Sequence, residues 1–231
     1  MTAKRRAQWA VASLLVAIVL SIATIWLARR ALGADTDQLA ERAVELALAQ
    51  RPAAAGAPDD QMRAQMVPFM RGMLSLYPVT VSVGVVVWTV VVSTVLMGAW
   101  RVIGVPVGWI MAFTACAAGS AASAVARFSV TVIVVFIIQR PISIDSLLDN
   151  SIVPLSVAAF LPSDVGAMWR SAASKLDLVQ LVFAVALVSY LVDEEGFGRE
   201  AGKIIGAMIA CYLLWIGLGM LWTAAWSGFA A

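Results

Sequence analysis

The chain has 231 residues, of which 62% are hydrophobic and 13% are charged, and its mean hydropathy is +0.91. These values lie far from those of a soluble domain and are typical of a multi-span membrane protein. The formal net charge of +2 gives no large basic face for nucleic acid. Histidine is absent, which removes the commonest general base and zinc ligand. We therefore expect no enzyme activity, no catalytic or metal site and no cofactor.

The first apolar run, Trp9 to Ala28, follows the basic residues Lys4, Arg5 and Arg6. It could be a signal peptide or a first membrane span. The run is longer than the core of a signal peptide, and its end is a poor cleavage site. We interpret residues 1–30 as a retained transmembrane helix with its amino terminus in the cytoplasm.

Residues 31–78 form the one long polar region, which we expect to be an extracytoplasmic helical segment. Asp35 and Gln38 resemble a capping box and predict a helix from about Asp37 to Arg51. A second helix is expected to begin near residue 59.

A methionine-rich stripe recurs at helical steps along this second helix. It consists of Met62, Met66, Met70, Met73 and Tyr77. Thioether side chains adapt to irregular partners, so the stripe could be a docking surface. The alternative is that it packs on the helix bundle or lies in the membrane interface.

Residues 79–231 are expected to form the main transmembrane domain. Its first span is Val79 to Trp100, and a long apolar tract follows from Trp109 to Ile138. As a helix the tract would measure about 45 Å, longer than the roughly 30 Å hydrocarbon core. It is therefore one tilted helix or two short ones. The apolar insert at residues 152–161 is too short to span and is predicted to be re-entrant or interfacial.

A helical hairpin is expected to end the chain. It begins with Ser174-Lys175-Leu176-Asp177-Leu178, an apolar run follows to Val192, and a second apolar run extends from Ile204 to Trp226. The acidic cluster Asp193-Glu194-Glu195 lies in the charged turn, which we interpret as solvated. The fold class is thus all-α and polytopic, with about five transmembrane helices, or six if the long tract crosses twice.

Small residues recur every four positions along the turn and the final helix. They are Gly198, Gly202, Gly206 and Ala210. Such a stripe lets helix backbones approach closely in lipid. It indicates either packing inside the chain or contact with a second copy or another protein. A similar row of small residues, including Ala115 and Gly119, marks the first part of the long tract.

Arg127 is the only charged residue inside the long apolar tract. A charge at the bilayer centre costs at least about 2.5 to 3.5 kcal/mol on insertion scales, so it needs a partner or water. We propose Asp177, at the start of the hairpin, as that partner. The alternative is that the tract breaks into two helices and Arg127 lies at the membrane interface.

Three short motifs carry a family resemblance: Val153-Pro154-Leu155-Ser156, Lys175-Leu176-Asp177-Leu178 and Gly198-Arg199-Glu200-Ala201. Together with Phe69-Met70-Arg71-Gly72-Met73-Leu74, they resemble the bacterial branch of the Yip family, the Ypt- and Rab-interacting-protein domain. The resemblance implies five spans and no catalysis. It also implies action beside an efflux ABC transporter of the macrolide-exporter type, with a periplasmic adaptor.

Two functions follow as hypotheses. The first is a non-catalytic accessory subunit of the bacterial inner membrane that binds a larger complex, an ABC permease with its adaptor, or else forms a homo-oligomer. The alternative is a small transporter or channel with an intramembrane site at Arg127 and Asp177.

Overall fold

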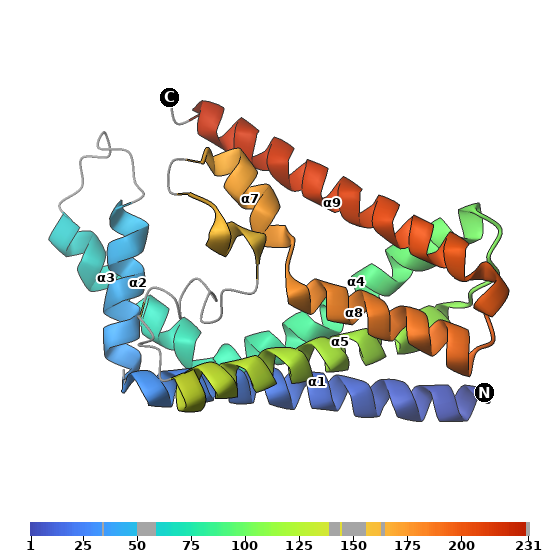
Figure 1. Cartoon of the computed structure of the whole chain (residues 1–231). Coiled ribbons are helices and arrows are strands. Elements are labelled where there is room, and N and C mark those ends of the chain that lie inside the picture. Colours follow the sequence, from blue (N-terminus) through green and yellow to red (C-terminus); the bar gives the residue numbers. More distant parts are fainter. Residues whose placement is uncertain (34, 50–58, 139–143, 145–155, 163–164, 230–231) are drawn as a thin grey trace. The chain divides into compact units, whose positions relative to one another are not determined.

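The computed structural model describes residues 1–33, 35–49, 59–138, 144, 156–162 and 165–229. In this part of the chain no strand occurs, and the one β-bridge joins Ser156 to Asp177. The elements of Figure 1 are α1 (Ala3–Leu32), α2 (Thr36–Ala49), α3 (Asp59–Ser75), α4 (Tyr77–Val102), α5 (Trp109–Val132), η1 (Ile133–Ile138), η2 (Val157–Phe160), α7 (Ala167–Lys175), α8 (Leu178–Ser189), η3 (Tyr190–Glu194), η4 (Gly198–Glu200) and α9 (Ala201–Phe229). The predicted fold class, an all-α polytopic membrane protein, is confirmed.

Four described helices are long and apolar enough to cross a bilayer: Ala3–Leu32, Tyr77–Val102, Trp109–Ile138 and Gly198–Ala224. The long tract is one helix, because α5 continues directly into the π-helix η1. The six-span alternative, which required two short helices here, is therefore wrong.

The first arm of the hairpin is shorter than expected. It consists of α8 and η3, and at about 1.5 Å per residue it measures about 25 Å. A separate helix, α7, occupies the chain up to Lys175, and the arm begins at Leu178 with Asp177 at its entrance, as expected. Asp177 starts α8 as its N-cap, and its side chain accepts a hydrogen bond from the Val179 backbone N–H at 2.9 Å.

The chain packs as two units. The first consists of Met1–Leu20, Gly84–Arg127 and Pro154–Ala231, and the second of Ser21–Val83 and Phe128–Val153. Each is described by itself below. The predicted segment boundaries at residues 30 and 78 stay a prediction.

The core of the first unit lies where α4, α5, α8 and α9 meet. Trp100 is fully buried and donates a hydrogen bond from its indole N–H to the Ile204 carbonyl at 3.3 Å, which joins α4 to α9. Small side chains of α5 are buried beside it, so the helices approach closely. These α5 residues are Ala112, Ala115 and Cys116.

Gly119 of α5 makes the tightest contact in this core. A Cβ added at Gly119 would lie 2.9 Å from both the ring and the carbonyl oxygen of Phe183 in α8. Only glycine therefore allows α5 and α8 to pack at this distance.

The second unit contains α2 and α3, which pack against each other (Figure 1). The predicted cap at Asp35 is confirmed, because its carboxylate accepts from the Gln38 N–H at 2.8 Å. Leu39 and Ala28 are buried together at the base of α2. Ion pairs link the two helices, such as Arg71 Nε to Asp37 Oδ1 at 2.6 Å, but they are half exposed and contribute only about 0–1 kcal/mol each.

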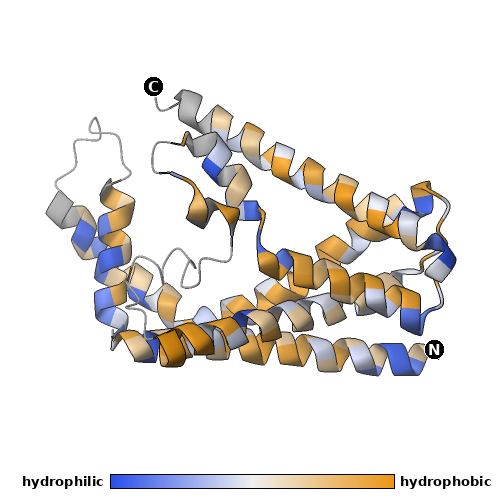
Figure 2. Cartoon of the chain, in the orientation of Figure 1, coloured by the Kyte–Doolittle hydropathy of each residue, from blue (hydrophilic) through white to orange (hydrophobic). Residues whose placement is uncertain are grey.

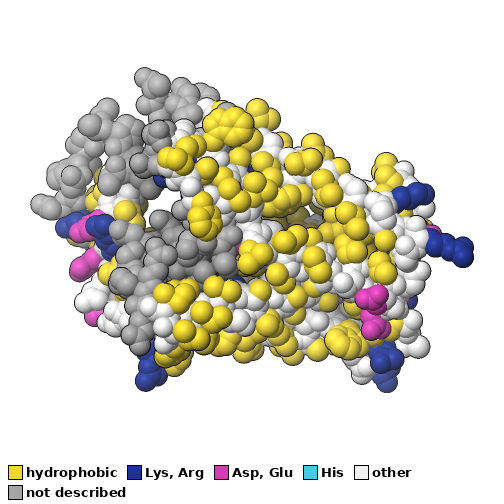
Figure 3. Space-filling model, viewed as in Figure 1, with side chains coloured by type: hydrophobic (Ala, Val, Ile, Leu, Met, Phe, Trp, Pro, Cys, Tyr) yellow, Lys and Arg dark blue, Asp and Glu magenta, His cyan; other side chains and the backbone are white. Residues whose placement is uncertain are grey.

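The outer surface of α9 is apolar. Figure 2 shows hydrophilic residues gathered where α1 begins and where α8 turns into α9, whereas α9 itself is mainly hydrophobic. Hydrophobic side chains cover much of the visible face in Figure 3. Leu214, Leu218 and Trp222 are each more than 60% exposed. Such a surface is suited to lipid contact and not to water.

Candidate functional site

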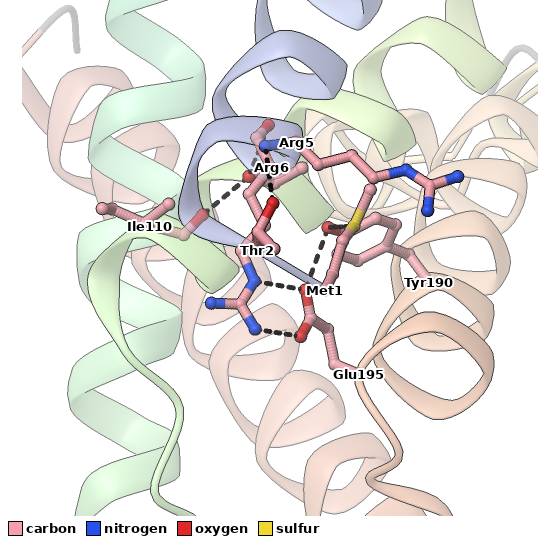
Figure 4. A network of polar contacts seen from close by, with 8 residues as sticks. Met1, Thr2, Arg5, Arg6, Ile110, Tyr190 and Glu195 are labelled. Carbon is pink, nitrogen blue, oxygen red and sulfur yellow. Dashed lines mark hydrogen bonds and ion pairs between the residues drawn. The ribbon is translucent and has the colours of Figure 1, made fainter.

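An ion pair closes the end of the first unit where α1 begins (Figure 4). Arg6 donates from Nε to Glu195 Oε1 at 2.7 Å and from Nη2 to Oε2 at 2.5 Å. The Glu195 side chain is only 2% exposed and that of Arg6 is 19% exposed. This two-point geometry is the strongest form of an arginine–carboxylate contact.

Two further groups extend the pair into a network that joins α1, α5 and η3. The Tyr190 hydroxyl donates to Glu195 Oε1 at 3.1 Å. The Thr114 hydroxyl lies 3.4 Å from the Arg6 carbonyl and 2.7 Å from that of Ile110. Burial acts to raise the pKa of Glu195, but the hydrogen bonds from Arg6 and Tyr190 outweigh it, so this pKa lies below its ordinary value.

This network corrects the interpretation of the acidic turn. Asp193 and Glu194 are exposed as expected, but Glu195 is nearly buried and paired. Sequence reasoning missed the pair because Arg6 lies 189 residues away. The available signal was the predicted topology, which places the basic start of the first span and the hairpin turn on the same side of the membrane.

The structure brings Arg127 and Asp177 together, as the sequence analysis proposed. Arg127 Nη2 lies 3.9 Å from Asp177 Oδ2, with side chains 37% and 21% exposed. This is a long contact, and Asp177 also caps α8. Asp177 therefore has two roles: it caps the start of α8, and it pairs with the charge of Arg127 in α5.

The level of this pair follows from helix geometry. Along α5, Arg127 is about 27 Å from Trp109. Along α8 and η3, Asp177 is about 27 Å from Glu195 as well. The hydrocarbon core of a bilayer is about 30 Å thick. Relative to the charged end at Arg6 and Glu195, Arg127 and Asp177 thus form a second group of charges about one hydrocarbon thickness away along their helices.

Lys175 of α7 lies against α9 at the same level. Its ammonium is 5.0 Å from the Trp215 ring centroid and 3.4 Å from the Trp215 carbonyl oxygen. The Tyr212 hydroxyl donates to the Lys175 carbonyl. Leu176 is exposed. The other motif residues singled out, Pro154 and Leu155, lie outside the described residues.

The small-residue stripe of α9 faces outward. Gly202 and Gly206 are exposed, and no described atom lies within 4 Å of a Cβ built on either. Ala210 is exposed too, and only Val192 comes within 4.0 Å of Gly198. Among the described residues, none packs on Gly202 or Gly206, so packing inside this part of the chain does not account for these two glycines.

The methionine stripe is divided by a helix boundary. Met62, Met66 and Met70 of α3 are half-buried, whereas Met73 is 49% exposed. Tyr77 belongs to α4, because α3 ends at Ser75. The stripe is thus shorter than its spacing indicated, and its exposed part is near the end of α3.

Comparisons with family models, curated proteins and solved structures gave no match. The resemblance to the Yip family stays a prediction from its short motifs. The structure shows the helical membrane fold, the Arg6–Glu195 and Arg127–Asp177 ion pairs of the first unit and the exposed small-residue face of α9.

Proposed function

We propose that the chain is a non-catalytic accessory subunit that docks onto a larger membrane protein through α9. The observation that carries this proposal is the outward stripe of Gly202, Gly206 and Ala210. In lipid, helix association is driven by close packing and not by apolar burial, and small residues make close packing possible.

Within the described residues, no side chain occupies the space that these two glycines leave. Glycine is less favourable than alanine in a helix interior by about 1 kcal/mol. At Gly119 the chain itself uses the space that glycine leaves, because Phe183 fills it. At Gly202 and Gly206 that space is open, and the exposed side chains of Ile205 and Ile209 flank it. A second transmembrane helix fits such a face.

The partner we propose is an ABC-type efflux permease with a periplasmic adaptor, in the inner membrane of a bacterium. The motif resemblance supports this identity, and the absence of histidine supports a binding role over a catalytic one. The half-exposed end of the methionine stripe at Met73 offers a second contact on a separate part of the chain.

The test is purification of the tagged full chain from its native membrane in mild detergent, with quantitative mass spectrometry of bound proteins. We expect an ABC permease in stoichiometric amount, and we expect Gly202→Leu with Gly206→Leu to remove it. Gly84→Leu is the matched control, because Gly84 is exposed in α4 with open space at its Cβ.

Two results would contradict the proposal. One is a partner retained in full by the double variant. The other is a chain that carries only lipid under every mild extraction. A second copy as the sole partner, lost in the double variant, would replace the ABC permease with a homo-oligomer while leaving α9 as the docking face.

The Arg127 and Asp177 contact favours a second candidate, a small ion transporter or channel. The pair lies near a membrane boundary by helix length, which supports this function less than a mid-membrane position would. Ion flux into vesicles reconstituted with the chain tests it. Flux that Arg127→Ala abolishes would favour the transporter, and flux unchanged in that variant would exclude a role for this pair.

A further inference from the structure

We propose that Lys175 and the hollow beside it on α9 bind the phosphate of an anionic phospholipid headgroup. This inference goes beyond the docking role and does not depend on it. The hollow has a volume of about 310 Å³ and is lined by Lys175, Trp215, Leu218, Gly219, Trp222 and Thr223. The Lys175 ammonium is thus the one charged group among these lining residues, and most of the other side chains are apolar or aromatic.

The charge of Lys175 is not neutralised by the chain in its described part. Its ammonium contacts the Trp215 ring and one carbonyl oxygen, and no described carboxylate forms an ion pair with it. The nearby carboxylate of Asp177 lies 3.9 Å from Arg127 and pairs with that side chain instead. An anion would therefore complement the Lys175 ammonium.

Gly219 is what allows the ammonium to lie on α9. A Cβ added at Gly219 would be 1.5 Å from the Lys175 Nζ atom and 2.7 Å from its Cε atom. An alanine there would push the lysine head away from Trp215 while leaving the backbone in place, because only the far end of a flexible side chain has to move. Gly219 therefore positions the charge that we assign to phosphate binding.

The site lies about one hydrocarbon thickness along α9 from the charged start of this helix. Gly219 is about 27 Å along α9 from Ala201, the same distance that separates Arg127 and Asp177 from the charged end on their own helices. Three helices thus place these charges about one hydrocarbon thickness from the charged end. Leu218, one residue nearer the membrane centre than Gly219, is 63% exposed and can contact an acyl chain. Trp222, about one turn farther out and 69% exposed, lies at the headgroup level that tryptophan favours.

The test measures lipid binding to the purified full chain in mild detergent. Phosphatidylglycerol, phosphatidylcholine and inorganic phosphate are titrated separately, with bound lipid counted by native mass spectrometry and stability followed by thermal unfolding. We expect phosphatidylglycerol to bind about tenfold more tightly than phosphatidylcholine, as one charge-assisted contact allows, and inorganic phosphate to have no comparable effect.

Two variants and one control locate the site. Lys175→Gln is expected to remove the preference for phosphatidylglycerol. Gly219→Ala is expected to weaken this preference several-fold. If Lys175→Gln fails to fold, the result for Gly219→Ala decides whether the Lys175 ammonium binds the lipid. Lys203→Gln is the control, because Lys203 is an exposed lysine at the other end of α9. It is expected to bind both lipids like the parent chain.

Equal binding of the two lipids to the parent chain would overturn the proposal. A preference that both Lys175→Gln and Gly219→Ala retain would overturn it as well. Protection by inorganic phosphate equal to that by phosphatidylglycerol would show that the site takes a free anion and would overturn the assignment to lipid.

Discussion

Two helices of the first unit carry rows of small residues, and their surroundings differ. On α5, Ala112, Ala115 and Gly119 are buried, and Gly119 is closed by Phe183. On α9, Gly202 and Gly206 are exposed with open space above them. The same sequence pattern thus builds the core in one helix and remains uncovered in the other. A small-residue row predicts that something approaches closely, but only the tertiary structure says whether the chain itself supplies it.

The largest effect is expected from filling the α5 row. Gly119→Val places a Cβ 2.9 Å from the Phe183 carbonyl, which is backbone and cannot move aside easily. We expect a loss of about 3 kcal/mol in the free energy of unfolding. Reversible unfolding of the purified chain in mixed micelles measures it. Gly206→Val is the matched control and should change stability by no more than about 0.5 kcal/mol. Equal losses in the two variants would refute the contrast between the helices.

The next effect concerns the Arg6–Glu195 ion pair beside the start of α5, which we call the clamp. Arg6→Ala leaves Glu195 nearly buried without its cation, and we expect it to cost about 2 kcal/mol, below the full value for a buried pair because Arg6 is partly exposed. Arg5→Ala is the control, since Arg5 is exposed and only its backbone N–H forms a hydrogen bond. The same unfolding measurement serves, and a neutral Arg6→Ala would mean that the pair does not hold α1 in place.

The same clamp predicts a dependence on pH. The pKa of Glu195 is lower in the folded chain than in the unfolded one, so the folded state binds fewer protons. Its stabilisation is present above the ordinary glutamate pKa of about 4.3 and is lost as the pH falls through the lower folded value. Thermal unfolding between pH 7 and pH 3 should show this loss. Glu195→Gln should reduce the loss, and an unchanged pH profile in that variant would assign it to other carboxylates.

The smallest effect is the change in stability when each glycine is replaced by alanine. It compares the two helices most sharply, because the change should be stabilising in α9 and destabilising in α5. Gly206→Ala adds a methyl group to open space in a helix, and we expect it to stabilise the isolated chain by about 0.5 kcal/mol. Gly119→Ala should destabilise it, since the new Cβ meets Phe183. Chemical unfolding of both variants side by side measures the difference. Two changes of the same sign would show that the local surroundings of these glycines do not decide the outcome.

Much of the fold follows from local sequence. Apolar run length predicted about five spans, of which four are helices long and apolar enough to cross a bilayer in the described residues, and Asp35 predicted the start of α2. Arg127 and Asp177 could be paired from the cost of an isolated charge in an apolar tract.

The remaining features depend on packing between distant segments. Arg6 meets Glu195 across 189 residues, and no local pattern marks which of three adjacent acids is buried. The sequence alone could not predict that the α9 stripe points outward. Helical periodicity defines a face of a helix but not what covers that face. Likewise, the position of Lys175 over Gly219 requires α7 and α9 to be packed together.

The most direct test of the central claim is photo-crosslinking from the edge of the α9 stripe in native membranes. A photoreactive residue at Ile209, which is 54% exposed, leaves Gly202 and Gly206 intact. The same residue at Val87 of α4, also 54% exposed, reports a lipid-facing position. The account predicts a protein adduct from Ile209 and lipid adducts alone from Val87. Lipid adducts alone from both positions would contradict it.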